Sequence, residues 1–304
     1  MDNSEQRPQE TAAEIEQKTK TLLKAPSYRK AYKDEDFLQG DDARELRLLA
    51  EYMKADTAFR KKRILSTIIV FGSARIKSPK TARDNLEAVE KKLRSDPDSE
   101  SLKTECAKAK TALEFSKYYE EARKLGEIVS ECNQFYAMED PEPLRHLDYV
   151  ICTGGGPGIM EAANRGAWDA GGVSIGLNIS LPFEQRPNPY ITPDLCFQYH
   201  YFAMRKMHFM IRARALVAFP GGFGTFDELF EALTLRQTGR MQTLPIILFG
   251  EHFWRKCINF EYLAEAGMIS PKDLDLITFV ETADEAWDSI REFYTKIRMH
   301  KSES

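Results

Sequence analysis

Residues 215–228 of this 304-residue chain read ALVAFPGGFGTFDE, and the interpretation of the rest of the sequence starts from this stretch. The apolar run Ala215–Phe219 is typical of a buried strand, and the amphipathic segment Leu229–Leu235 that follows has helical spacing. The glycines between them therefore form a turn from a strand into a helix. Such a turn lets backbone N–H groups approach an anion closely, and the helix dipole favours negative charge there. The residues predicted to bind a phosphate are Gly221, Gly222, Gly224 and Thr225.

Glu228, which lies one helical turn further on, has two interpretations. Beside a bound phosphate, its carboxylate would face the rest of the ligand. Alternatively, Thr225 and Glu228 form a capping box, with Thr at the N-cap and Glu at N3, and Glu228 is then structural. The pattern of residues leaves both interpretations open.

Two further strand-to-helix turns have the same character. Ile68–Phe71 reads as a buried strand that ends in Gly72 and Ser73. Tyr149–Thr153 reads as another strand, followed by the glycines of 154–158. Continuous apolar strands that alternate with helices are typical of a parallel sheet covered on both faces, and such sheets bind ligands beyond the carboxyl ends of their strands. We therefore expect the three turns to meet at one crevice.

The predicted fold is a Rossmann-like, doubly wound α/β domain over residues 64–300, preceded by a helical, partly mobile N-terminal extension over residues 1–63. Between the first and second strands, residues 80–131 read as a helical insertion that is broken near 95–98. Residues 181–197 contain four prolines and are predicted to be a loop. The other predicted elements are strands over 173–178, 216–219, 245–249 and 277–280, and helices over 159–170, 200–214, 225–236, 254–266 and 283–297.

Several motifs belong together. Pro220–Glu228 matches the pattern PGGxGTxxE, and Gly154–Glu161 looks like the first glycine turn of the same family. Met204–Lys206 looks like its M-x-x-R-K element, with the Met adjacent to the Arg, and residues 71–75 look like its first loop. On these motifs, residues 64 to about 290 resemble the LOG family, the cytokinin-activating phosphoribohydrolases often mislabelled as lysine decarboxylases. The length resembles the long bacterial branch of that family.

The resemblance implies roles for individual residues. Arg205 and Glu228 match the two residues that family members need for catalysis, and Arg205 is expected to orient Glu228 and keep it ionised. Glu161 and Asn164 are expected to border the base of a nucleotide. The residues implied to bind the substrate are Gly72, Ser73, Gly155, Glu184, Lys206, Gly221, Gly222, Gly224 and Thr225. The spacing of Met204, Met207 and Ile211 makes them the apolar stripe of the helix that carries Arg205.

Other chemistries are disfavoured. Ile159 stands where the last glycine of G-x-G-x-x-G would be, which argues against a nicotinamide dehydrogenase. The five histidines contain no i, i+4 pair and no H-E-x-x-H, so no metal is expected. No cofactor is expected either, because nothing around Lys206 supports a Schiff base with pyridoxal phosphate.

Composition limits the partners. The net charge of −4 argues against a nucleic-acid partner, and no apolar run reaches the roughly 18 residues of a membrane span. The five cysteines form no C-x-x-C pair, and the N-terminus lacks the pattern of a signal peptide. Both features favour a cytoplasmic protein.

The sequence thus predicts a hydrolase that cleaves the N-glycosidic bond of nucleoside 5′-monophosphates, AMP or cytokinin ribotides, to free base and ribose 5-phosphate. The alternative is a non-catalytic nucleotide sensor or carrier of the same fold. The resemblance implies a homodimer or higher homo-oligomer.

Overall fold

The computed structural model describes residues 11–139, 146–181 and 186–302. The chain divides into two compact units between Glu51 and Tyr52, within helix α3 (Arg44–Lys61). The sequence placed this division at residue 63. It falls earlier because the second half of α3 belongs to the core of the second unit, where Ala55 and Phe59 are buried.

The first unit is helical, and its helices α1 and α2 begin at side-chain caps. Thr11 and Glu14 form a capping box at the start of α1 (Ala12–Lys24), and the side chain of Asp34 caps α2 (Glu35–Gln39). No residue of α1 is buried. The caps, rather than a hydrophobic core, therefore account for its helical start. Short 3₁₀ helices are present at Pro26–Tyr28, Ala31–Lys33 and Asp41–Ala43.

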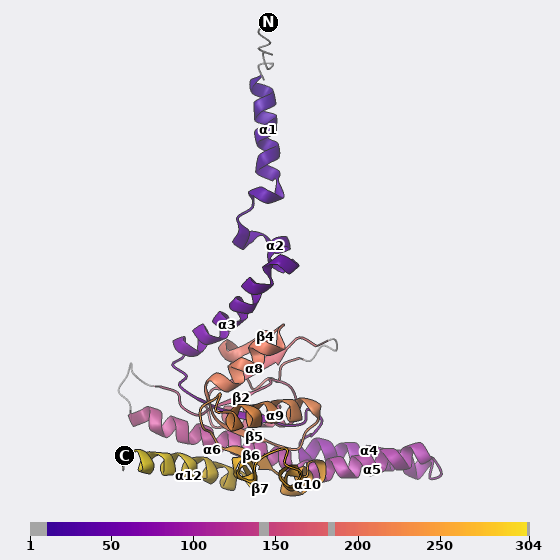
Figure 1. Cartoon of the computed structure of the whole chain (residues 1–304). Coiled ribbons are helices and arrows are strands. Elements are labelled where there is room, and N and C mark those ends of the chain that lie inside the picture. Colours follow the sequence, from indigo (N-terminus) through magenta and orange to yellow (C-terminus); the bar gives the residue numbers. More distant parts are fainter. Residues whose placement is uncertain (1–10, 140–145, 182–185, 303–304) are drawn as a thin grey trace. The chain divides into compact units, whose positions relative to one another are not determined.

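The second unit is built on a seven-stranded sheet in which all neighbouring strands are parallel (Figure 1). The strand order is β4-β3-β2-β1-β5-β6-β7, so the direction of winding reverses between β1 and β5. In sheets of this kind, the crevice at the reversal is where ligands bind. The strands are β1 (Thr67–Phe71), β2 (Val150–Thr153), β3 (Ser174–Ile179), β4 (Cys196–Tyr199), β5 (Ala213–Ala218), β6 (Ile246–Phe249) and β7 (Ile277–Val280).

Helices cover both faces of this sheet. Successive residues of β1 alternate between two hydrophobic cores, with Ile69 in one and Ile68 in the other. The first core is closed by α8 (Phe202–Ile211), α9 (Phe223–Gln237), α10 (Glu251–Cys257), α11 (Phe260–Glu265) and the end of α3. The second is closed by α6 (Lys117–Glu139), α7 (Ile159–Asp169) and α12 (Ala283–Ser302). The predicted Rossmann-like, doubly wound α/β fold is confirmed. Among the described residues, no helix has both the length and the apolar character needed to cross a membrane.

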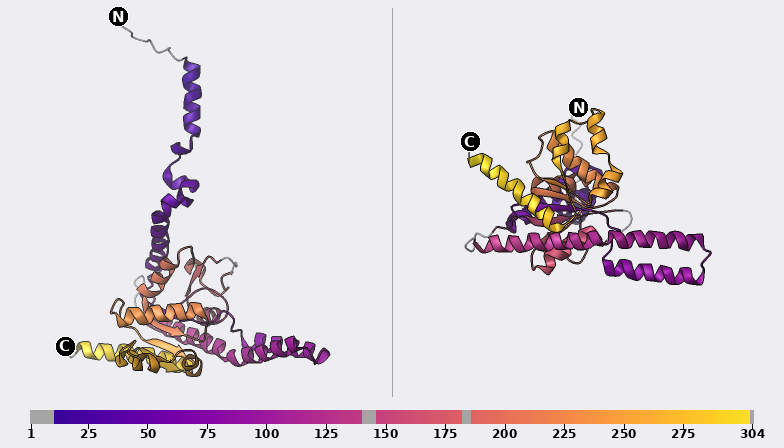
Figure 2. Two further views of the ribbon diagram at one scale, coloured as in Figure 1. Left: turned by 45° about the vertical axis from the view of Figure 1, so that its right-hand side comes forward. Right: turned by 90° about the horizontal axis from the view of Figure 1, so that it is seen from below.

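Helices occupy the range predicted as an insertion. Helices α4 (Pro79–Ser95) and α5 (Glu100–Phe115) lie side by side as a hairpin, and α6 returns to the sheet (Figure 2). Ser99 caps α5, accepting a hydrogen bond from the N–H of Leu102, and this places the break where the sequence predicted it.

Helices α6 and α7 pack backbone against backbone. A Cβ atom at Gly126 would collide with the carbonyl oxygen of Ala163, and one at Gly166 with the carbonyl oxygen of Arg123. Glycine is therefore required at both positions, since any side chain would push the helices apart.

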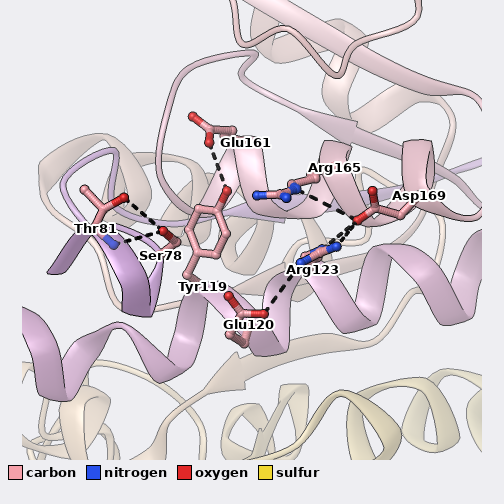
Figure 3. Close-up of polar contacts among 8 residues, drawn as sticks. All are labelled: Ser78, Thr81, Tyr119, Glu120, Arg123, Glu161, Arg165 and Asp169. Carbon is pink, nitrogen blue, oxygen red and sulfur yellow. Dashed lines mark hydrogen bonds and ion pairs between the residues drawn. The ribbon is translucent and has the colours of Figure 1, made fainter. Parts of the chain in front are cut away.

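Polar contacts reinforce this packing (Figure 3). The hydroxyl of Tyr119 on α6 donates to Oε1 of Glu161, in the first turn of α7, at 2.9 Å. Near the other end of α7, Nε of Arg123 donates to Oδ2 of Asp169 at 2.6 Å. The insertion is thus fastened to the helix that follows the first glycine turn.

Three sequence predictions were wrong in detail. Residues 181–197 do not form only a loop: β4 starts at Cys196, after the 3₁₀ helix Pro193–Leu195. The helix predicted over 200–214 ends at Ile211, and β5 begins at Ala213. The helix predicted over 254–266 is two helices, because the side chain of Asn259 caps a new start at α11. The 3₁₀ helix Pro271–Leu276 precedes β7.

Candidate active site

The turns after β1, β2 and β5 are joined by hydrogen bonds through Ser73. Its N–H donates to the carbonyl oxygen of Pro220 at 3.0 Å, and its own carbonyl oxygen accepts the N–H of Ile159 at 3.2 Å. A Cβ atom at Gly72 would also collide with the side chain of Ile159, because it would lie only 2.6 Å from Cγ2 of that residue. The three turns that the sequence singled out therefore meet at the reversal of the sheet, as predicted. Gly72 and Ser73 serve that junction.

In the turn after β2, which is the first glycine turn, protein atoms fill the space beside the glycines. A Cβ at Gly154 would lie 2.6 Å from Nη2 of Arg205 and 2.9 Å from Sδ of Met160. Gly155 and Gly158 have φ of 75° and 74°, and a Cβ on either would collide with Asn178 or with the carbonyl oxygen of Ser73, respectively. Gly154, Gly155 and Gly158 thus each have a reason within the fold.

Two asparagines hold the first turn in place. Nδ2 of Asn188 donates to the carbonyl oxygens of Gly155 and Gly156 at 3.2 and 3.1 Å, and to Oδ1 of Asn164 at 3.0 Å. Asn164 is fully buried, and its Oδ1 also accepts the hydroxyl of Thr153 at 2.7 Å. The expectation that Asn164 borders a base is therefore wrong, since its side chain is used up inside the fold. The sequence did not point to Asn188, because a single asparagine in a proline-rich loop carries no signal.

The second glycine turn, which follows β5, has more open surroundings than the first. A Cβ at Gly221 would collide with Oγ1 of Thr225, but nothing lies within 4 Å of a Cβ at Gly222 or Gly224. Gly222 has an ordinary φ of −99°, and Gly224 is not among the positive-φ glycines. Neither conformation nor packing in the protein therefore explains glycine at these two positions.

The start of α9 rules out the capping box. Gly222 is the N-cap residue, no side chain caps the helix, and the helix starts at Phe223. Thr225 is already helical and its N–H donates to the carbonyl oxygen of Gly222 at 2.9 Å. The structural interpretation of Glu228 as N3 of a helix capped by Thr225 is consequently wrong. The first turn of α9 offers uncapped N–H groups beside the open space at Gly222 and Gly224.

Arg205 is held at the junction of β2, β3 and α8. Its Nε donates to the carbonyl oxygen of Leu177 at 2.7 Å, and its guanidinium carbon lies 5.2 Å from the ring centre of Phe209. It makes no ion pair with Glu228, although both residues are in the described part of the chain. The expected direct orientation of Glu228 by Arg205 is therefore not seen.

Glu228 is a buried carboxyl group. Its side chain is 5% exposed, and its Oε2 accepts no hydrogen bond from the described residues. Burial raises its pKa to about 7, although the charges of Lys206 and Arg205 act to lower it. The charge of Arg205 therefore acts in the expected direction, towards the ionised form of Glu228, but burial outweighs it. A carboxyl group with this pKa is about half protonated near neutral pH and can both give and take a proton.

Lys206 is engaged by acids on α9. Its Nζ lies 2.8 Å from Oδ2 of Asp227, 2.8 Å from Oε2 of Glu231 and 3.9 Å from Oε2 of Glu228. The sequence implied a direct contact of Lys206 with substrate. The contacts of Lys206 within the protein place it beside Glu228, and they identify Asp227 and Glu231 as neighbours that the motif did not single out.

The remaining predictions have mixed outcomes. Glu184 lies outside the described residues. On α8, the buried residues are His208 and Phe209, whereas Met207 and Ile211 of the predicted apolar stripe are 37% and 46% exposed. Within the described ranges, no group of three or more His, Cys, Asp or Glu side chains is arranged to hold a metal ion.

The chain has relatives among known proteins. A family model described as possible lysine decarboxylase matches residues 160–290. A probable cytokinin riboside 5′-monophosphate phosphoribohydrolase of Oryza sativa subsp. japonica is 27% identical over 157 residues, which are 49% of this chain and 70% of that protein. A pyrimidine/purine nucleotide 5′-monophosphate nucleosidase of Escherichia coli K12 is 31% identical over 140 residues, 41% of this chain and 29% of that protein.

A solved structure is also similar in part. The molybdenum cofactor binding protein of Rippkaea orientalis is 18% identical with a TM-score of 0.42, over 58% of this chain and 88% of that chain. A similarity this low bears on neither activity nor ligand.

Proposed function

We propose that this chain, which belongs to the LOG family, hydrolyses the N-glycosidic bond of nucleoside 5′-monophosphates to free base and ribose 5-phosphate. One observation carries the proposal. Beside the uncapped start of α9, Gly222 and Gly224 face open space, and one turn further on lies the buried Glu228 with an oxygen that accepts no hydrogen bond from the described residues. An anion site next to a carboxyl group is what a sugar phosphate requires.

The phosphate binds at the second glycine turn in this proposal. The N–H groups of the first turn of α9 donate to its oxygens, and the helix dipole favours its charge. Glycine at 222 and 224 lets the phosphate approach the backbone, because a methyl group at either position would occupy the same space. Thr225, 6% exposed, packs against Gly221 and supports the turn from within.

The chemistry follows from the position and protonation of Glu228. The C1′–N bond breaks, its electron pair leaves with the base, and positive charge develops on the ribose. The oxygen of a water molecule forms the new bond to C1′, a proton of that water passes to the ionised carboxylate of Glu228, and solvent protonates the departing base. A carboxyl group with a pKa of about 7 is suited to accept and then release this proton.

Arg205 supplies positive potential on the other side of the crevice. Its guanidinium lies against Gly154, so the first glycine turn determines where that charge is held. AMP is the first substrate to test, and cytokinin ribotides are the second, because the rice relative is a probable cytokinin riboside 5′-monophosphate phosphoribohydrolase.

The test incubates pure protein with nucleoside mono-, di- and triphosphates and with nucleosides, in EDTA, and measures released base by chromatography. We expect monophosphates to be cleaved and EDTA to have no effect. Saturable binding of AMP without any base release would contradict hydrolysis and favour the non-catalytic sensor or carrier. Activity that EDTA abolishes and a divalent ion restores would contradict the metal-free chemistry.

We also propose that the protein forms a homo-oligomer through α8 and α9. The outer face of these helices exposes apolar side chains beside the site, with Phe223 at 96% and Ile211 at 46% exposure. An exposed apolar patch of this kind is typical of an interface. Light scattering after gel filtration should give a mass above the 34.9 kDa of one chain, and Phe223→Ser should lower it. A monomer at high concentration would contradict the proposal.

A further inference from the structure

The carboxyl group of Glu228 is one of three acids that surround a single lysine. Asp227, Glu228 and Glu231 lie on the first turns of α9, and Lys206 reaches them from α8. Nζ of Lys206 is 2.8 Å from both Asp227 and Glu231, but 3.9 Å from Oε2 of Glu228. The lysine therefore makes its close ion pairs with the two outer acids.

The three acids also differ in burial, and the one farthest from Lys206 is the most buried. The side chain of Glu228 is 5% exposed, whereas those of Glu231 and Asp227 are 31% and 58% exposed. The two outer acids are thus partly exposed to water, and each lies within ion-pair distance of Lys206. Glu228 is dry and has neither a close cation nor a hydrogen bond to Oε2 from the described residues. A buried carboxylate in that position is costly unless it takes up a proton.

The charged groups that face Glu228 are Lys206 and Arg205 on α8 and Glu231 and Asp227 on α9. The two cations favour its ionised form and the two acids disfavour it. Because each acid also holds Lys206 away from Glu228, removing either acid acts twice in the same direction. It removes a like charge, and it frees the lysine to approach.

We propose that Asp227 and Glu231 are positioning residues for the reaction, which hold Lys206 between them so that Glu228 stays free of a close ion pair and can exchange a proton during cleavage. The role in the reaction rests on the proposed function, whereas the effect of the two acids on the protonation of Glu228 does not depend on it.

The experiment follows the Glu228 carboxyl by ¹³C NMR across a pH titration of the full chain with labelled glutamate side chains. The signal that is missing in Glu228→Gln identifies the group. Asp227→Asn and Glu231→Gln should each move its titration downwards by about one pH unit, and the more buried Glu231 should have the larger effect. Lys206→Met should move it upwards. Glu292→Gln is the matched control, because Glu292 on α12 is an exposed acid that also pairs with a lysine, Lys296 at 3.6 Å.

A parallel pH profile of kcat/KM for AMP connects the titration to the reaction, since it reports groups of the free enzyme. Its acid limb should move with the NMR titration in the same variants. A Glu228 titration that is unchanged in Asp227→Asn and Glu231→Gln, or that moves equally in Glu292→Gln, overturns the inference. So does a pH profile that stays in place while the titration moves. If the titration moves as expected but the unaltered protein releases no base, the proposed function fails and the arrangement of charges stands.

Discussion

The turns after β2 and β5 are both rich in glycine and both lead into a helix, but their glycines have opposite surroundings. In the first turn, Gly154 faces Arg205 and Met160, and Gly158 faces the backbone of Ser73. In the second turn, nothing in the protein lies near Gly222 or Gly224. One turn is packed by the protein itself, whereas the other leaves room for something else.

The helices that follow these two turns, α7 and α9, differ in the same way, because a buried polar group is satisfied in one and not in the other. The polar side chain buried in α7 is Asn164, whose oxygen accepts two hydrogen bonds. In α9 the buried ionisable side chain is that of Glu228, whose Oε2 accepts no hydrogen bond from the described residues. Unsatisfied buried groups and unexplained glycines destabilise a fold, and they persist where a function requires them. Equal glycine content in two motifs therefore does not mean equal function. In the proposed function, the turn after β2 builds the site and the turn after β5 receives the ligand.

The largest expected effect is on catalysis by Glu228. Glu228→Gln removes the proton acceptor without changing the size of the side chain, and base release from AMP should fall about 10²–10³-fold. The measurement is kcat by chromatography, with AMP binding followed by calorimetry and retained. Asn164→Asp is the counterpart in α7, and it should lose stability rather than specific activity per folded molecule. A Glu228→Gln protein with more than about a tenth of the original kcat would remove the distinction between the two helices.

The second effect concerns the pH dependence of stability. The pKa of Glu228 is raised by burial from 4.5 to about 7, so the folded protein binds more protons than the unfolded chain between these values. Stability is therefore lost as the pH rises through this window, by an amount on the order of 3 kcal/mol. Denaturant unfolding should find Glu228→Gln more stable than the unaltered protein at pH 8, and the difference should be much smaller at pH 4.5. An equal difference at both pH values would contradict the burial of an ionisable Glu228.

Alanine at Gly158 tests the packed turn. Its φ of 74° and the collision of a Cβ with the carbonyl oxygen of Ser73 both oppose a side chain. Gly158→Ala should reduce the free energy of unfolding by about 1–3 kcal/mol. Urea unfolding at constant pH measures this change. If the variant is as stable as the unaltered protein, the first turn is not packed as described.

Alanine at Gly224 should have the smallest effect on stability, and of opposite sign. The position is helical and nothing lies within 4 Å of a Cβ there. Since alanine is a better helix former than glycine, Gly224→Ala should leave stability unchanged or raise it by up to about 1 kcal/mol. A clear loss in the same urea measurement would show that Gly224 is required by the fold after all.

Much of the fold could be predicted from the sequence, because apolar runs such as Ile68–Phe71 need no knowledge of their neighbours to be identified as buried strands. Edge strand β4 could not, since only Phe197 and Tyr199 are buried in it and prolines precede it. Nor could the start of α9, because Thr225 is a plausible cap in sequence and only the backbone places the cap at Gly222.

The candidate site was predictable in its motifs but not in its geometry. Arg205 and Glu228 were both identified, yet the partner of Arg205 is the carbonyl oxygen of Leu177 and that of Lys206 is a pair of acids. These contacts join segments that are distant in sequence, and a pattern of residue types does not encode which atoms meet. The same holds for the glycines, whose surroundings depend on residues such as Asn178 and Ser73 from other turns.

The most direct test of the central claim compares AMP with adenosine in two proteins. Base release is measured as kcat/KM for both compounds with the unaltered chain and with Gly224→Ala. If the space at Gly222 and Gly224 receives the phosphate, the unaltered chain should prefer AMP by about tenfold to a hundredfold or more, the value of one or two charge-assisted hydrogen bonds. In Gly224→Ala this preference should collapse, because cleavage of AMP falls while the slow cleavage of adenosine stays the same. A preference that survives Gly224→Ala, or an unaltered chain that cleaves both compounds equally or cleaves neither, would contradict the account.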